Sequence, residues 1–354
     1  CGSATPSTVV PGTPCRFSPT SLVGQPPLET DRGAAFFAEQ CSSARARPDA
    51  TPSSSSSSRE AEATRRPCRA TRGWKKGSQI GHGSYGSVHL ARDMQDGFIF
   101  AVKKARGEAD DGGYCEKLRR ELEICEDLRH PNIVSCLGHE VVKGHLCIYL
   151  EYVPGGSLRS HLEEFGALEE PLLRKASRGI LKGLDYLHTH NPPVVHRDLK
   201  GANVLVDLSF CCKLADFGCS KRSTQTQSFT SCGSAQWCAP EVFKDELGFG
   251  RKADIWSFGC VVLEMATAAD PWGKGVFDNM MQVVHVICMS QRTPPIPEAV
   301  PPVGKELAGR CLKRSPEDRP HCPELLGLEV LGPAGARPAG ALQRSGSSAS
   351  KPRR

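Results

Sequence analysis

The stretch His196–Asn203, which reads HRDLKGAN, is the most informative segment of this 354-residue chain, and a second short motif, Asp-Phe-Gly, begins at Asp216. Together they bring two carboxylates, one amine and one amide into a fixed order along the chain. Transfer of a phosphoryl group needs this kind of set, because it depends on positioning and on cations that offset negative charge. We expect Asp198 to orient a substrate hydroxyl and accept its proton, and Lys200 to neutralise charge on the phosphate.

A glycine-rich segment lies upstream and reads Gly81-His82-Gly83-Ser84-Tyr85-Gly86-Ser87-Val88. Glycines let backbone N–H groups approach phosphate oxygens without interference from a Cβ atom. Dinucleotide-binding proteins share this spacing, but their fingerprint needs a helix that begins inside the motif. Here the residues after Val88 continue as a strand, and the next strand ends in Ala101-Val102-Lys103. This order favours a loop that covers nucleotide phosphates over a dinucleotide-dependent enzyme.

Lys103 follows an apolar strand, where a lysine is either at an exposed edge or paired. The helix that follows argues for pairing, because Leu118, Glu121, Cys125 and Leu128 recur at three- and four-residue spacing and so share one face. A carboxylate on an apolar face needs a partner. We therefore predict an ion pair between Glu121 and Lys103 that holds the lysine on the phosphates.

With these motifs in place, the segment from Trp74 to about Leu331 resembles a serine/threonine protein kinase domain. Further landmarks match at Ala239-Pro240-Glu241, at Asp254–Gly259 and at Arg319. The resemblance implies an α+β, bilobal protein kinase fold, with a small β-rich N-lobe that contains one helix and a larger α-helical C-lobe. It also implies that ATP and Mg²⁺ are used to phosphorylate Ser or Thr hydroxyls of protein substrates.

The resemblance also assigns the site. Its catalytic residues are Asp198, Lys103, Glu121 and Lys200, and its magnesium ligands are Asn203 and Asp216. The residues expected around ATP are Ile80, Gly81, His82, Gly83, Ser84, Tyr85, Gly86, Val88, Ala101, Lys103, Glu151 and Val153. Of these, Glu151 and Val153 are expected to offer backbone groups to the adenine.

Looser similarities concern the kind of kinase. Lys200, two residues after Asp198, is the serine/threonine form, and the segments Gly155–Leu158 and Lys213–Cys219 are similar to mitogen-activated protein kinase kinase kinases. The segment Ser234–Trp237 departs from that subfamily because it lacks a proline. A serine/threonine kinase of another subfamily is therefore an alternative. A pseudokinase scaffold is a second alternative, although this chain keeps the Lys and both Asp residues that pseudokinases lose.

Composition predicts three parts. Residues 1–73 are rich in Ser, Pro and Arg and are expected to be a disordered tail, residues 74–331 form the kinase domain, and residues 332–354 form a second disordered tail. The 17 cysteines include no CxxC pair, which favours reduced thiols over zinc ligands or a disulfide framework.

Charge and hydropathy limit the kinds of partner that we expect. The net charge of +6 comes from scattered Lys and Arg residues, so we expect no nucleic-acid partner. No apolar stretch reaches the roughly 18–20 residues that span a bilayer, and no signal peptide is visible. We expect a protein substrate, which could be another kinase, and we expect no membrane partner and no obligate oligomer. We expect the protein to be cytoplasmic, with the nucleus as an alternative.

Two further expectations concern control and substrate choice. Thr230, with Ser228 and Ser231 as alternatives, is placed where related kinases carry an activating phosphate, which Arg197 would hold. Ser157 and Ala202 are uncharged at two positions where arginine-selecting kinases have acidic residues. We therefore expect weak selection for arginine upstream of the phosphorylated residue.

Overall fold

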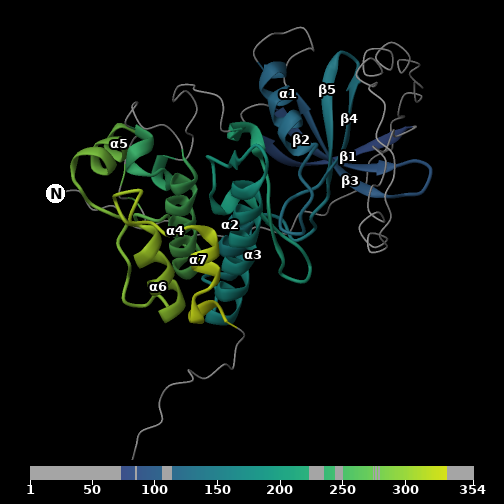
Figure 1. The fold of residues 1–354 in the computed structure, drawn as a ribbon. Coiled ribbons are helices and arrows are strands. Elements are labelled where there is room, and N and C mark those ends of the chain that lie inside the picture. Colours follow the sequence, from purple (N-terminus) through teal and green to yellow (C-terminus); the bar gives the residue numbers. More distant parts are fainter. Residues whose placement is uncertain are drawn as a thin grey trace, which may run out of the picture. The chain divides into compact units, whose positions relative to one another are not determined.

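The computed structural model describes residues 73–83, 86–105, 114–222, 235–243, 250–273, 275, 277 and 280–332. These residues form a β-rich N-lobe followed by a helical C-lobe (Figure 1). The α+β bilobal kinase fold is therefore confirmed. Apart from Gly73 and Gly332, the two predicted tails lie outside the described residues.

The N-lobe is built on one antiparallel sheet with the strand order β1-β2-β3-β5-β4. Its strands are β1 (Trp74–Gly83), β2 (Gly86–Asp93), β3 (Ile99–Ala105), β4 (Cys136–Val142) and β5 (His145–Glu151). Helix α1 (Tyr114–Cys125) follows β3. A turn joins β2 and β3, and Gly97 adopts there the positive φ of 74° that favours glycine.

The two faces of this sheet contact different parts of the protein. Side chains alternate between the faces along each strand. One face carries a small aromatic core around Phe100 and Tyr149, whose rings meet edge to face at 5.4 Å. The other face carries Val88, Ala101 and Lys103 and lines the cleft toward the C-lobe.

The C-lobe is mainly helical. Its helices are α2 (Leu158–Phe165), α3 (Glu170–Thr189), α4 (Arg251–Thr267), α5 (Met280–Met289), α6 (Pro302–Cys311) and α7 (Cys322–Leu326). Short strands β6 (Val194–Val195) and β9 (Lys221–Arg222) pair, as do β7 (Val204–Val206) and β8 (Cys212–Leu214). Short 3₁₀ turns lie at η1 (Gly201–Asn203), η2 (Phe217–Cys219), η3 (Ala235–Trp237), η4 (Pro240–Phe243) and η5 (Glu329–Leu331).

Two helices form the centre of the C-lobe. On α3, apolar residues at three- and four-residue spacing form a stripe that is completely buried and includes Leu173, Ile180 and Leu187. Helix α4 is buried continuously from Ala253 to Met265, so it is covered on every side. A helix of this kind is a rigid support for the loops that contact it. Within the described residues, no helix has the length and apolar character needed to cross a membrane.

Candidate active site

Lys103 lies at the centre of a charged cluster inside the cleft. Its Nζ atom is 2.7 Å from both carboxylate oxygens of Glu121 and 2.8 Å from Oδ1 of Asp216. The three residues come from β3, from α1 and from the loop after β8. The predicted Lys103–Glu121 pair is therefore present, and it joins the N-lobe helix to a residue of the C-lobe.

Burial and charge act in opposite directions on this cluster. Burial would lower the pKa of Lys103, but the Glu121 and Asp216 carboxylates outweigh it and raise the pKa above its ordinary value. Burial also raises the pKa of Glu121, against the effect of Lys103. Burial would likewise raise the pKa of Asp216, but the charge and hydrogen bond of Lys103 outweigh it and lower that pKa. At neutral pH Lys103 is therefore a buried cation.

The loop from His196 to Asn203 presents a second charged cluster. Lys200 Nζ lies 3.0 Å from Oδ2 of Asp198. Asn203 Nδ2 donates to the same carboxylate oxygen at 2.9 Å and to the backbone carbonyl of Asp198 at 2.8 Å. These bonds fix the Asp198 side chain from two sides, and they leave the amide oxygen of Asn203 available to another ligand.

Helix α4 holds the start of this loop through Asp254. The Asp254 carboxylate accepts the backbone N–H groups of His196 and Arg197, each at 2.9 Å, and lies 2.8 Å from Nε2 of His188. Burial would raise the pKa of Asp254, but the hydrogen bond from His188 and these further contacts outweigh it and lower the pKa. The buried helix thus positions the residues that precede Asp198.

Asp216 takes an unusual backbone conformation, with φ of 61° and ψ of 77°. A non-glycine residue in the left-handed region is uncommon and is often found where a side chain must be aimed. Here the conformation directs the carboxylate toward Lys103.

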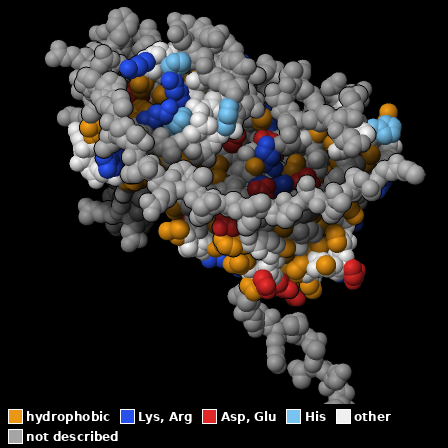
Figure 2. Space-filling view, turned by 180° about the vertical axis from the view of Figure 1, so that it is seen from behind, with side chains coloured by type: hydrophobic (Ala, Val, Ile, Leu, Met, Phe, Trp, Pro, Cys, Tyr) orange, Lys and Arg blue, Asp and Glu red, His pale blue; other side chains and the backbone are white. Residues whose placement is uncertain are grey.

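A cavity of about 550 Å³ lies between the lobes, beside Lys103 and Asn203. Its lining includes the predicted residues Ile80, Gly81, His82, Val88, Ala101, Lys103, Glu121, Glu151, Val153, Asn203 and Asp216. Gly86 is described but does not line it. Gly83 is described only as the last residue of β1, and Ser84 and Tyr85 lie outside the described residues. Figure 2 shows basic and acidic side chains next to each other in a hollow of the molecular surface.

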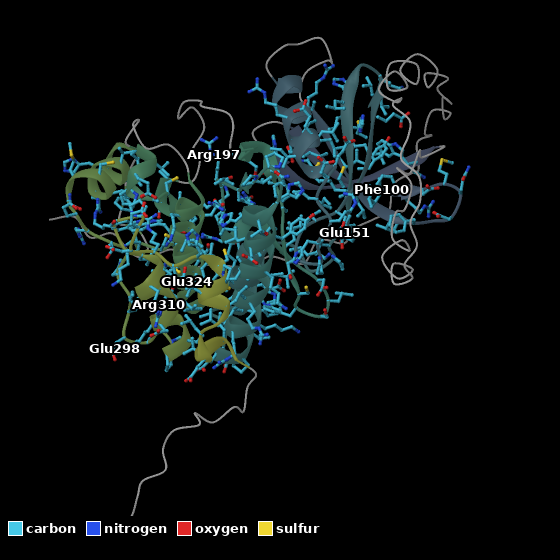
Figure 3. All side chains as sticks on the ribbon, in the orientation of Figure 1. Phe100, Glu151, Arg197, Glu298, Arg310 and Glu324 are labelled. Carbon is cyan, nitrogen blue, oxygen red and sulfur yellow. The ribbon has the colours of Figure 1, made fainter. Side chains whose placement is uncertain are left out.

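The edge of this cavity next to Glu151 can contact a planar base. Glu151 lies where the two lobes meet (Figure 3). Its backbone N–H already donates to the carbonyl of Ser135 at 2.9 Å, so it can offer a base only its carbonyl. Its carboxylate bonds Lys213 at 2.9 Å and so serves another role.

The donor set fits a nucleotide with a hard divalent cation. Asn203 and Asp216 offer the oxygen ligands that Mg²⁺ prefers, and Lys103 adds a cation for phosphate oxygens. The apolar residues Val88, Ala101 and Leu205 line the same cavity and suit the faces of a purine.

Some site residues were not expected from the sequence. Glu264 on α4 is buried and accepts the N–H of Gly201 and the indole N–H of Trp237, both at 3.0 Å. Val134, Leu205 and Ala215 line the cavity. An isolated Glu or Ala has no motif around it, so its role shows only when distant segments meet. Two of the landmarks named from the sequence meet in the structure, because Arg319 donates two hydrogen bonds of 2.5 and 2.8 Å to the Glu241 carboxylate.

The segment expected to carry an activating phosphate lies outside the described residues, and this includes Thr230, Ser228, Ser231 and Ser234. Arg197, which would hold that phosphate, is described and lies on the C-lobe near its upper edge in Figure 3. Phosphorylation of this segment therefore stays a prediction.

Comparison with known proteins identifies the family of this chain. A family model described as a protein kinase domain matches residues 74–331. The chain therefore belongs to the protein kinase domain family.

The curated relatives support the predicted subfamily. The chain is 41% identical over 262 residues to "Mitogen-activated protein kinase kinase kinase A" of Dictyostelium discoideum, which covers 72% of this chain and 27% of the relative. It is 40% identical over 257 residues to "Mitogen-activated protein kinase kinase kinase 3" of Arabidopsis thaliana, with 72% and 41% covered. For "Mitogen-activated protein kinase kinase kinase YODA" of Arabidopsis thaliana the identity is 42%, with 72% and 28% covered. The chain thus spans between about a quarter and two fifths of these relatives.

Proposed function

We propose that this protein is an ATP-dependent serine/threonine kinase that phosphorylates protein substrates. The observation that carries the proposal is the position of Lys103 between Glu121 and Asp216, at 2.7 and 2.8 Å. This arrangement joins the two lobes through the residue that would bind the phosphates, so the cleft has the geometry that phosphoryl transfer needs.

Each charged residue has a distinct task in this proposal. Lys103 binds the inner phosphate oxygens of ATP, and Glu121 keeps its amine in place. Asp198 orients the substrate hydroxyl and receives its proton as the oxygen attacks the γ-phosphorus, while the bond from that phosphorus to the bridging oxygen breaks and ADP leaves. Lys200, 3.0 Å from Asp198, offsets the charge that develops on the transferred group.

Magnesium would be held by Asn203 and Asp216. When bound, it neutralises charge on the phosphates. Asn203 also holds the Asp198 carboxylate at 2.9 Å, so one side chain links the metal position to the residue that orients the hydroxyl.

The direct test is transfer of labelled phosphate from ATP to a generic protein substrate, compared with Asp198→Asn. This variant keeps the shape of the side chain and should still bind ATP, but it cannot accept a proton. We expect phosphoryl transfer to fall by several orders of magnitude. A variant with near-normal transfer would show that another residue orients the hydroxyl.

The same test separates a kinase from a pseudokinase scaffold. A scaffold would transfer no phosphate either before or after the Asp198→Asn change, whereas a kinase loses transfer only in the variant. The retained cluster of Lys103, Asp198 and Asp216 favours catalysis.

We further propose that the substrate is itself a protein kinase. The support is the name and the roughly 40% identity of the curated relatives. A comparison of phosphorylated proteins between cells with the active protein and cells with Asp198→Asn would test this. Absence of any kinase among the lost phosphoproteins would contradict it, without affecting the assignment as a kinase.

A further inference from the structure

The outer face of the N-lobe sheet carries a group of basic side chains that the kinase site does not use. The register pairs Lys76 with Ala91, His89 with Val102 and Ser87 with Lys104. Directly opposed residues share a face, as do residues two apart on one strand. Lys76, His89 and Lys104 therefore project from the same face, with Ser87 between two of them. Figure 2 shows Lys, Arg and His side chains gathered over the N-lobe.

These groups have little to neutralise them. No ion pair or hydrogen bond joins the side chain of Lys76 or Lys104 to another described residue. His89 Nε2 lies 3.0 Å from Ser87 Oγ, but Nδ1 is buried and has no hydrogen-bond partner among the described residues. His89 itself is only 8% exposed. A buried polar atom without a partner is costly, so a ligand or a neighbouring group is expected there.

The acidic residues of the same face are already engaged. Asp93 Oδ1 accepts the backbone N–H of Gln95 at 2.8 Å and so closes the turn after β2. Glu140 accepts the hydroxyl of Tyr149 at 2.5 Å, across β5 from Lys104. Among the described residues, neither carboxylate forms an ion pair with Lys76 or Lys104.

The positive charges of Lys76 and Lys104 therefore disfavour a further positive charge on His89. Burial, followed by the charges of Lys76 and Lys104, lowers the pKa of His89. An anion bound between positive groups arranged in this way is attracted to each of them. A phosphoryl group suits them best, because it carries about two negative charges and several acceptor oxygens.

We propose that Lys76, His89, Lys104 and Ser87 form a binding site for a phosphoryl oxyanion on the outer face of the N-lobe sheet. The two lysines supply charge, and His89 and Ser87 supply hydrogen-bonding groups. This site is separate from the nucleotide cavity. Ser87 and His89 alternate along β2 with Val88, which lines the cavity on the opposite face.

Two sources could supply such a group. One is free phosphate. The other is a phosphoserine of a protein ligand, which carries the same phosphoryl group on a peptide. Both present the same chemistry to the site, and the experiment below distinguishes them.

The experiment uses the full chain after phosphatase treatment and follows the imidazole resonances of His89 by NMR at constant pH and ionic strength. Inorganic phosphate is the probe, and His89→Gln assigns the resonances. We compare Lys76→Gln and Lys104→Gln with Lys75→Gln, which removes the same charge from a neighbouring residue that projects from the opposite face. Thermal unfolding checks that each variant is folded.

We expect phosphate to shift the His89 resonances in a saturable way. Lys76→Gln and Lys104→Gln should each weaken binding about tenfold, and Lys75→Gln by less than about twofold, because charge-assisted bonds require direct contact. The proposal is overturned if phosphate leaves His89 unchanged, or if Lys75→Gln weakens binding as much as the other two. A generic phosphoserine peptide that binds more tightly than phosphate identifies a phosphorylated protein as the source, and weaker binding identifies the free anion.

Discussion

Gly201 donates its backbone N–H to the Glu264 carboxylate at 3.0 Å, and the contact joins the catalytic loop to the buried helix α4. The same carboxylate oxygen accepts the indole N–H of Trp237 at 3.0 Å, from the end of the activation segment. Burial raises the pKa of Glu264, and both hydrogen bonds oppose that effect. One carboxylate thus fixes two segments that the sequence separates widely.

The first prediction tests this contact by filling the space at Gly201. A Cβ atom there would lie 2.6 Å from Oε1 of Glu264, which is too close. Gly201→Ala should push Glu264 aside and move the loop that carries Asp198, and we expect kcat to fall by about tenfold or more. Steady-state kinetics is the measurement.

The matched control is Gly309→Ala on helix α6, where an added Cβ would meet no described atom within 4 Å. It should leave kcat unchanged and stabilise the protein slightly, because alanine favours helix over glycine. Equal activity of the two variants would show that the Gly201–Glu264 contact does not position the loop.

The second prediction concerns Lys103→Met. This change removes the cation that would bind the phosphates and leaves Glu121 buried without its partner. We expect loss of at least about a hundredfold in kcat/KM, together with a lower Tm, because breaking a buried ion pair costs several kcal/mol. Lys305→Met, at a partly exposed lysine whose partner Glu298 is fully exposed, should change neither quantity. Near-normal activity of Lys103→Met would mean that another lysine binds the phosphates.

Much of this architecture could be predicted from the sequence, because its signals are local. Three- and four-residue spacing located the face of α1 that carries Glu121, and the motif around Asp198 located the catalytic loop. The bounds of strand β4 could not be located from the sequence, since Gly138 and His139 interrupt the apolar alternation that marks a strand. The role of Glu264 was missed for a different reason. It depends on contacts with Gly201 and Trp237, which no local pattern encodes.

The third prediction is a pH dependence of stability that comes from Asp254. Its pKa is lowered from the ordinary value of 3.8 in the folded protein. A depressed carboxyl pKa stabilises the fold above the unfolded value, and that contribution is lost as pH falls through the folded value. The free energy of unfolding should therefore drop steeply below about pH 4.

Denaturant unfolding between pH 6 and pH 3 measures this dependence. Below about pH 4, the unfolding free energy of Asp254→Asn should change less steeply with pH than that of the unmodified protein. The difference is up to about 1.4 kcal/mol per pH unit, which corresponds to one bound proton. Asp318→Asn, at an exposed carboxyl, should keep the slope of the unmodified protein. Identical slopes in all three proteins would contradict a role for Asp254 in acid stability.

The last prediction concerns substrate choice, and the structure adds a reason to expect weak selection for arginine. Ser157 uses its hydroxyl to cap α2 by accepting the N–H of Ser160 at 3.0 Å, and Ala202 is exposed and uncharged. The carboxylate of Glu163, which could have replaced an acidic residue here, is bound by Arg159 at 2.7 Å.

Arg159 also binds Asp270 at 2.7 Å and Glu264 at 3.4 Å, so it neutralises three carboxylates at once. A substrate arginine would have to displace this internal arginine and would gain little against its own hydration. In a positional peptide library we therefore expect no dominant arginine two or three residues before the target. Arg159→Ala should release the Glu163 and Asp270 carboxylates and raise the preference for arginine several-fold, whereas Arg310→Ala on α6, distant in sequence and bound to Glu306, should not. A strong arginine preference in the unmodified protein, unaltered by Arg159→Ala, would show that other carboxylates such as Glu164 or Glu169 face the substrate.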